Sequence, residues 1–256
     1  MTLAFRHLRE TDNTGDLGCC PYDYFSWPGA TVGDIRTRDE DYRIGVYGGG
    51  KIFGGLSTYD GVSKDPTKTH IAWGVSTLQR LPLSRRYARS RRLMDLTGSR
   101  DYGDKRYPWV PCVSCMATAF DDPPVPEHDV VFYYHGGKTE GQGITIPDDM
   151  PRLGNDQGDL KAALAFIGSG KTVVSNSYHG VYWGLLMGRK VLCLPFSYKF
   201  KAYRQPPAYG TPKDWLAKLE TAVARPDILG LCRERTLAFK AEVDALIAVA
   251  EAREAP

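Results

Sequence analysis

The sequence predicts an α/β fold of two Rossmann-like halves, with helices near the C-terminus. Short apolar runs that end in glycine or polar turn residues alternate with helical patterns along the 256 residues, which is typical of parallel sheets with helices on their faces. A proline-rich stretch at 121–126 is the best linker candidate. We therefore expect an N-terminal domain over 1–120, a C-terminal domain over 121–256, and a ligand in the cleft beyond the strand carboxyl ends.

In the N-terminal half, residues 43–47 and 69–74 form apolar runs that end in glycine, and we expect both to be strands. A helical pattern over 83–96 follows and leads to a third strand–loop junction at 98–101. In the C-terminal half the expected strands are 129–135, 172–175 and 190–195, and the expected helices are 160–167, 180–187, 212–224 and 234–252.

Charge and cysteine content narrow the class of protein. A net charge of +3 is too small for a typical nucleic-acid binder, but it suits an enzyme that attracts an anionic substrate. The most apolar stretch, 181–196, is interrupted by Arg189 and Lys190, and residues 1–10 lack the apolar core of an export signal. With six cysteines and no such signal, we expect reduced thiols and a cytoplasmic location.

The most informative segment is 175–180, which reads Ser-Asn-Ser-Tyr-His-Gly between an expected strand and an apolar helix. Hydroxyls, an amide and the free N–H groups of the helix would meet at this junction and could hold a carboxylate or phosphate. His179 could move a proton beside such an anion. The alternative is a capped helix with a hydrogen-bonded histidine, but the number of polar groups favours a functional site.

Four weaker signals accompany this junction. Asp16, in an early Asn-Thr-Gly-Asp turn, is either an N-cap or a carboxylate that can act as a base. The glycine-rich loop at 48–55 allows close backbone approach to an anion or a sugar. Arg100 could grip an anion or simply pair with Asp101, and Lys199 adds positive charge after the next strand.

Two patterns are expected to be decoys. Residues 165–172 resemble a phosphate-binding loop, but here a helix precedes the glycines and a strand follows them, which is the reverse of a working loop. Cys112 and Cys115 form a single Cys-x-x-Cys pair. Zinc sites normally need a second pair or matching histidines, so we expect buried thiols and no metal site.

Taken in order, these motifs resemble the polysaccharide pyruvyl transferase family. The resemblance covers roughly residues 10–205 and depends on the order of six elements. These are Asn-x-Gly-Asp at 13–16, triple glycine at 48–50, Trp-Gly at 73–74, Arg-Asp at 100–101, the serine-to-histidine-glycine element at 175–180 and Ser-x-Lys at 197–199. The chain is short for the family, and it has Ser177 and Tyr178 where many members carry Arg-Leu.

The resemblance implies a compact arrangement like that of GT-B glycosyltransferases, with acceptor residues in the N-terminal domain and donor residues in the C-terminal one. It also implies transfer of pyruvate from phosphoenolpyruvate, as a co-substrate, to two hydroxyls of a sugar in a polysaccharide or its lipid-linked precursor. No cofactor is expected. The basic run at 85–92 is then either a solvated face or a peripheral contact with anionic lipid at the inner face of the membrane.

In this hypothesis His179 is the principal acid/base and Asp16 is its complement. The donor would be bound by Arg100, Asn176, Ser177, Tyr178 and Lys199, with Lys201 as a further candidate for the missing arginine. The acceptor sugar would face Gly49, Gly50, Lys51 and Trp73. Two alternatives stay open: a glycosyltransferase of similar architecture that uses an activated sugar, and a non-catalytic carbohydrate-binding homologue.

Overall fold

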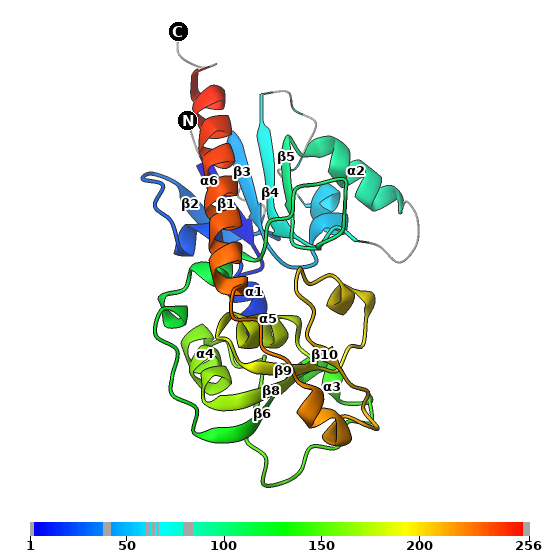
Figure 1. Cartoon of the computed structure of the whole chain (residues 1–256). Coiled ribbons are helices and arrows are strands. Elements are labelled where there is room, and N and C mark those ends of the chain that lie inside the picture. Colours follow the sequence, from blue (N-terminus) through cyan, green and yellow to red (C-terminus); the bar gives the residue numbers. More distant parts are fainter. Residues whose placement is uncertain are drawn as a thin grey trace. The chain divides into compact units, whose positions relative to one another are not determined.

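The computed structural model describes residues 3–37, 42–59, 67–78 and 84–252, together with Val62 and Asp65. Both the chain trace (Figure 1) and the contacts between its residues divide the protein into two compact units, each of which has its own sheet. Unit 1 consists of Met1–Glu10, Gly18–Ser114 and Cys232–Pro256, and unit 2 consists of Thr11–Leu17 and Cys115–Leu231.

Unit 1 contains a five-stranded parallel sheet with the strand order β2-β1-β3-β4-β5. The strands are β1 (Leu3–His7), β2 (Thr31–Asp34), β3 (Ile44–Gly48), β4 (Thr69–Val75) and β5 (Leu96–Ser99). Every residue of β3 and β4 is buried. Their near-continuous apolar sequences are typical of parallel strands that are covered on both faces.

Helix α2 (Arg85–Leu93) and the 3₁₀ helix η2 (Phe53–Thr58) pack against each other in unit 1. The long helix α6 (Ile228–Ala252) joins this unit from Cys232 onward. Its buried residues include Phe239, Val243 and Ile247, a spacing that puts them on one helix face. The ring of Phe239 meets the ring of Trp73 edge-on at 5.1 Å, so α6 completes the core of this unit.

Unit 2 contains a second five-stranded parallel sheet, with the order β10-β9-β8-β6-β7. The strands are β6 (His128–Tyr134), β7 (Arg152–Gly154), β8 (Gly170–Ser175), β9 (Lys190–Cys193) and β10 (Ala208–Tyr209). Alternate side chains of β6, β8 and β9 build a core cluster with Trp215, as expected when successive strand residues point to opposite faces.

Helices α4 (Leu160–Gly168) and α5 (Tyr178–Leu186) pack on β8 and on each other, and α5 also packs on β9. All nine residues of α5 are buried, which agrees with its apolar composition on every side. Unit 2 also contains the short helices α1 (Thr14–Leu17) and α3 (Gly136–Thr139).

The two sheets share one topology. In each, the second strand in sequence lies outside the first, and the third strand returns to the other side of the first, which gives the order 2-1-3-4-5. In doubly wound folds of this order, ligands bind beyond the carboxyl ends of the strands where the order reverses. These switch points lie at the ends of β1 and β3 in unit 1 and of β6 and β8 in unit 2.

The predicted α/β class is confirmed, and the predicted strands correspond to β3, β4, β5, β6, β8 and β9. Four strands were missed, namely β1, β2, β7 and β10. The helical pattern at 212–224 contains only the 3₁₀ helix η6 (Leu216–Thr221), and the helix predicted from 234 begins at Ile228. The helix predicted over 83–96 is the shorter α2, with an N-cap at Ser84, while Leu83 lies outside the described residues.

The two observed units differ in two segments from the predicted domains, which were contiguous at 1–120 and 121–256. Thr11–Leu17 belongs to unit 2, because the Thr14 amide donates to the Asn155 carbonyl at 2.8 Å and Asn13 bonds to the Asn155 side chain. The last helix returns to unit 1. The proline-rich stretch, predicted to be a linker, belongs to unit 2 and is largely exposed, and the Pro124 carbonyl accepts from Arg189.

The strand–helix junction of unit 2 should tolerate no side chain at Gly180. A Cβ there would lie 2.4 Å from both Ser175 Oγ and Tyr133 Cδ1. We expect Gly180→Ala to lower the free energy of unfolding by about 1–3 kcal/mol, measured by urea denaturation. The control is Gly137→Ala in α3, where a Cβ would meet nothing within 4 Å, and its change should stay within about 0.5 kcal/mol. Equal stability of the two variants would contradict this packing.

Candidate functional site

The candidate site lies at the switch point of unit 2, where the loops that follow β6 and β8 adjoin. The loop after β6 begins with His135, and the loop after β8 contains Asn176. The His135 amide donates to Asn176 Oδ1 at 2.9 Å, and the Asn176 amide group donates to Thr139 Oγ1 at 2.9 Å. Asn176, predicted to bind a donor, therefore also holds the two loops together.

A second asparagine pair brings the early turn to the same edge of the sheet. Asn155 follows β7 and accepts from the Gly136 amide at 3.0 Å, while its own amide group donates to Asn13 Oδ1 at 3.0 Å. Asn13 in turn donates to Asp16 Oδ2 at 2.9 Å. This chain of hydrogen bonds fixes the Asp16 carboxylate, which is only partly buried, within unit 2.

The same turn packs directly on His179. A Cβ built on Gly15 would lie 2.1 Å from His179 Nδ1, so only a glycine permits this approach. The imidazole is buried and also lies against the rings of Tyr178 and Trp183, at centroid distances of 5.5 and 5.2 Å. The predicted partners His179 and Asp16 thus belong to one unit, and residue 15 of the turn touches the imidazole.

Helix α5 begins at this junction with Ser177 as its N-cap, and the Ser177 hydroxyl makes no cap hydrogen bond to the helix. The Ser175 hydroxyl is committed to the backbone instead, since it donates to the Tyr133 carbonyl at 2.6 Å and accepts from the Ser177 amide at 3.0 Å. The first turn of α5 therefore has no side-chain cap from Ser177, and the partial positive charge of a helix N-terminus favours an anion.

Basic groups surround His135. Burial lowers the pKa of His135, the ammonium groups of Lys199 and Lys138 lower it further, and the Asp16 carboxylate opposes them. Its Nδ1 is buried without a hydrogen-bond partner among the described residues. Lys199 itself lies over the rings of Phe196 and Phe200, 5.1 Å from each centroid. This edge of the sheet therefore combines positive charge with a neutral imidazole.

Tyr178 forms part of an aromatic layer. Its ring stacks on that of Tyr203 at 4.8 Å and 13°, and the Tyr203 hydroxyl donates to the Tyr178 carbonyl at 2.9 Å. Both rings are buried. The residue that replaces the leucine of the family pattern is therefore anchored from two sides by Tyr203.

The predicted acceptor residues lie in unit 1, and packing explains most of them. Gly49 has a φ of +50°, and a Cβ on it would lie 2.4 Å from Cys19 Sγ, so the glycine is required by its neighbours. Gly50 accepts from the Ser76 amide at 2.9 Å, and Lys51 is exposed. Trp73 lies in the aromatic core rather than on a surface.

Arg100 also belongs to unit 1, whereas the other predicted donor-binding residues belong to unit 2. It is buried after β5, and its amide donates to the Val75 carbonyl at 3.0 Å. The adjacent Asp101 carboxylate accepts from the Ser76 hydroxyl and from the Leu78 amide, both at 2.8 Å. Asp101 therefore braces the loop that follows β4.

The structure shows the order of elements around the apparent phosphate-binding loop and the burial of the two cysteines, and both agree with the prediction. In the apparent phosphate-binding loop, Gly168 ends helix α4, and Gly170 and Lys171 begin strand β8, so a helix precedes the loop and a strand follows it, the reverse of a working loop. Cys112 and Cys115 are both buried thiols, and Cys112 Sγ lies 3.5 Å from Cys19 Sγ.

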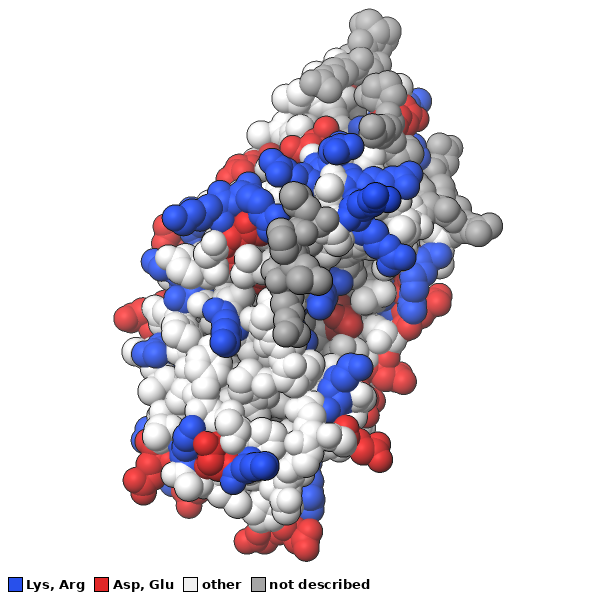
Figure 2. Space-filling model, turned by 90° about the vertical axis from the view of Figure 1, so that its right-hand side faces the viewer, with Lys and Arg blue, Asp and Glu red and all other residues white. Residues whose placement is uncertain are grey.

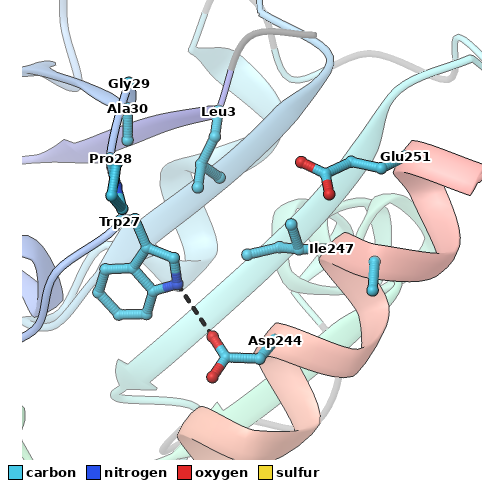
Figure 3. Close-up of a pocket in the computed structure, with 9 residues that line it drawn as sticks. Leu3, Trp27, Pro28, Gly29, Ala30, Asp244, Ile247 and Glu251 are labelled. Atoms are coloured by element: carbon cyan, nitrogen blue, oxygen red, sulfur yellow. Dashed lines mark hydrogen bonds between the residues drawn. The ribbon is translucent and has the colours of Figure 1, made fainter.

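A pocket of about 330 Å³ lies elsewhere in unit 1, between β1, the loop after Trp27 and helix α6 (Figure 3). The indole of Trp27 donates to Asp244 Oδ1 at 2.9 Å across it. Its acidic groups are Asp244 and Glu251, so the pocket disfavours an anion such as phosphoenolpyruvate. None of the predicted site residues lines it.

Sequence reasoning missed His135 and Asn155. His135 is the last residue of the predicted strand 129–135 and precedes two glycines, a position that by itself could have suggested a ligand loop. Asn155 had no such signal, because β7 has only three residues and shows no readable alternation.

A scan against protein-family models and a search of curated protein sequences found no match to this chain. The resemblance to pyruvyl transferases therefore depends on the motifs quoted above.

The lowered pKa of His135 predicts a pH effect on stability. In the unfolded chain His135 takes up a proton near its ordinary pKa of 6.5, whereas in the native protein it takes up the proton only at a lower pH. The native state therefore loses stability as pH falls below about 6.5. His135→Gln should reduce the loss of Tm between pH 7.5 and pH 5, and His128→Gln, at an exposed position of β6, should not. The same pH profile for wild type and His135→Gln would contradict the prediction.

Proposed function

We propose that this protein transfers pyruvate from phosphoenolpyruvate to two hydroxyls of a sugar and so forms a pyruvate ketal. The observation that carries the proposal is the packing of the Asn-Thr-Gly-Asp turn on His179. Two elements of the motif series, far apart in the sequence, meet in one unit at the edge of the sheet where ligands bind in this topology.

The charge at this edge supports an anionic donor. Phosphoenolpyruvate carries a carboxylate and a phosphate, and the amide groups at the start of α5 together with Lys199 offer the complementary charge. Asn176 and Ser177 supply neutral donors at the same junction. His135, which the motif series did not include, adds an imidazole that is neutral near pH 7.

The chemistry requires proton transfers in two directions. A base removes the proton of the first sugar hydroxyl as its oxygen adds to C2 of phosphoenolpyruvate, and an acid protonates C3 to give the methyl group. Phosphate then leaves from C2, and the second hydroxyl attacks this carbon and loses its proton to close the ketal. We assign the acid/base work to His179 and Asp16, which lie on adjoining elements.

The structure changes which residues we propose to face the acceptor sugar. The core position of Trp73 gives it a packing role, which leaves the exposed Lys51 as the acceptor-facing candidate of its loop. The finer architecture, a GT-B-like arrangement of two units, also stays part of the proposal; two parallel sheets of one topology support it.

A peripheral membrane contact, as a route to a lipid-linked acceptor, is a further part of the proposal. No helix in the described part of the chain is long and apolar enough to cross a membrane. Helix α2, however, exposes five arginines, and Figure 2 shows Lys and Arg side chains gathered on the face that carries it. Such a face attracts anionic headgroups. The arginines are Arg85, Arg86, Arg89, Arg91 and Arg92.

Removal of the acid/base groups should abolish turnover. We expect His179→Ala and Asp16→Asn each to slow phosphate release from phosphoenolpyruvate, in the presence of a lipid-linked sugar, by at least about a hundredfold. Asp12→Asn is the matched control, because this exposed carboxylate lies in the same loop and should leave the rate unchanged. Circular dichroism checks that the variants fold. Full activity in both site variants would refute the assignment.

Binding of the donor separates this proposal from its alternatives. Phosphoenolpyruvate should raise the Tm of the wild type, because a ligand that binds only the native state stabilises it. Lys199→Ala should weaken this effect, whereas Lys190→Ala, at the exposed first residue of β9, should not. Stabilisation by a nucleotide sugar instead of phosphoenolpyruvate would favour a glycosyltransferase. Sugar binding without turnover, indifferent to His179, would favour a non-catalytic homologue.

A further inference from the structure

A second cluster of reactive side chains lies at the switch point of unit 1, which the proposed function leaves unused. His7 is the last residue of β1, and Cys20 immediately precedes the 3₁₀ helix η1 (Pro21–Asp23), of which Asp23 is the last residue. One ligand atom from each of these three side chains lies within 4.8 Å of the other two.

The sheet topology makes this position a natural binding edge. The chain leaves β1, forms β2 on one side of it and returns to form β3 on the other side. The carboxyl end of β1 is therefore the point where the strand order reverses. His7 occupies that end, paired in register with Asp34 of β2.

Two of the three groups are deeply buried. The exposed fraction is 2% for His7 and 0% for Cys20, whereas Asp23 reaches solvent. The Nδ1 atom of His7 is buried and has no hydrogen-bond partner among the described residues. A buried nitrogen without a partner costs free energy, and a bound cation would supply the missing interaction.

The two buried side chains carry donor atoms that zinc-class ions use. A neutral imidazole offers a ring nitrogen, and a thiol that releases its proton on metal binding offers a thiolate sulfur.

Two other charged groups lie near the cluster. Asp34 is already engaged, because its carboxylate accepts from the Arg9 and Glu10 amides at 2.7 and 2.8 Å and pairs with the Arg36 guanidinium at 2.8 Å. The positive charge of Arg9 acts on all three cluster residues. Arg9 is exposed, so solvent screens its repulsion of a cation.

We propose that His7, Cys20 and Asp23 bind a divalent cation of the zinc class, with water as the fourth ligand. Imidazole and thiolate select zinc-class ions, whereas magnesium and calcium prefer oxygen ligands alone. Tetrahedral zinc with bonds of about 2.0–2.3 Å sets its ligand atoms about 3.3–3.8 Å apart. The exposed Asp23 side chain can make this modest adjustment. Binding would fasten the segment from Cys20 to Asp23 to the end of β1.

The test uses the full chain, stripped of metal with a chelator and kept under a non-thiol reductant, and titrates it with Co²⁺ as a spectroscopic probe. We expect one equivalent of Co²⁺ to give a thiolate-to-cobalt charge-transfer band and the visible bands of a tetrahedral ion. Zn²⁺ should displace Co²⁺, and Mg²⁺ should not. Zn²⁺ should also raise the Tm of the stripped protein.

Three variants decide whether these residues form the site. Asp23→Asn, at an exposed position that does not threaten folding, and Cys20→Ser should weaken Co²⁺ binding by at least about a hundredfold. Cys19→Ser changes the neighbouring buried thiol and should keep the wild-type spectrum. The proposal is overturned if the wild type shows no charge-transfer band. It is equally overturned if Asp23→Asn and Cys20→Ser bind normally, or if only Cys19→Ser loses the ion. These readouts do not depend on pyruvyl transfer.

Discussion

The candidate site depends on one set of hydrogen bonds, those through which Asn155 holds the turn at Asn13 in unit 2. The turn is short and far in sequence from the rest of the unit, so it has no sheet of its own to fix it. The Asn155 carbonyl and side chain bind both the backbone and the side chain of the turn. Together with the hydrogen bond from the Gly158 amide to the Asp12 carbonyl, these bonds hold Asp16 and the approach of Gly15 to His179 within unit 2.

Each of the two buried side-chain amides, Asn155 and Asn176, makes hydrogen bonds to two other residues of the site. Asn155 accepts from Gly136 after β6 and donates to Asn13, while Asn176 accepts from His135 and donates to Thr139. A side-chain amide has both donors and acceptors. It can therefore accept from an N–H group of one loop and donate to an oxygen of another. The polar network therefore orders the carboxyl edge of the sheet before any ligand arrives.

The sequence predicted the central strands and the His179 junction well, since both depend on local patterns. β3, β4, β6 and β8 are apolar runs with clear turn residues at their ends. The edge strands β7 and β10 have only three and two residues, too few for any periodicity to be read. The local pattern also could not show that Trp73 has a packing role. That role depends on its contact with Phe239 of α6, which lies far away in the sequence.

Tertiary contacts determined the rest, and no local rule could have replaced them. The turn with Asp16 was assigned to the N-terminal half because chain order is the only guide in a sequence, whereas hydrogen bonds to Asn155 decide its unit. The same holds for the cluster of His7, Cys20 and Asp23, whose spacing matches no zinc motif. Only the end of β1 brings these three residues together.

The two switch points place different side chains on one topology. Unit 2 surrounds its edge with amides, lysines and imidazoles, which suit an anion with several oxygens. Unit 1 places an imidazole, a thiol and a carboxylate at the equivalent strand, which suit a soft cation. Since both sheets have the order 2-1-3-4-5, the difference cannot come from the fold. It comes from the side chains at and beyond the carboxyl ends of the strands, where ligands bind in a doubly wound fold.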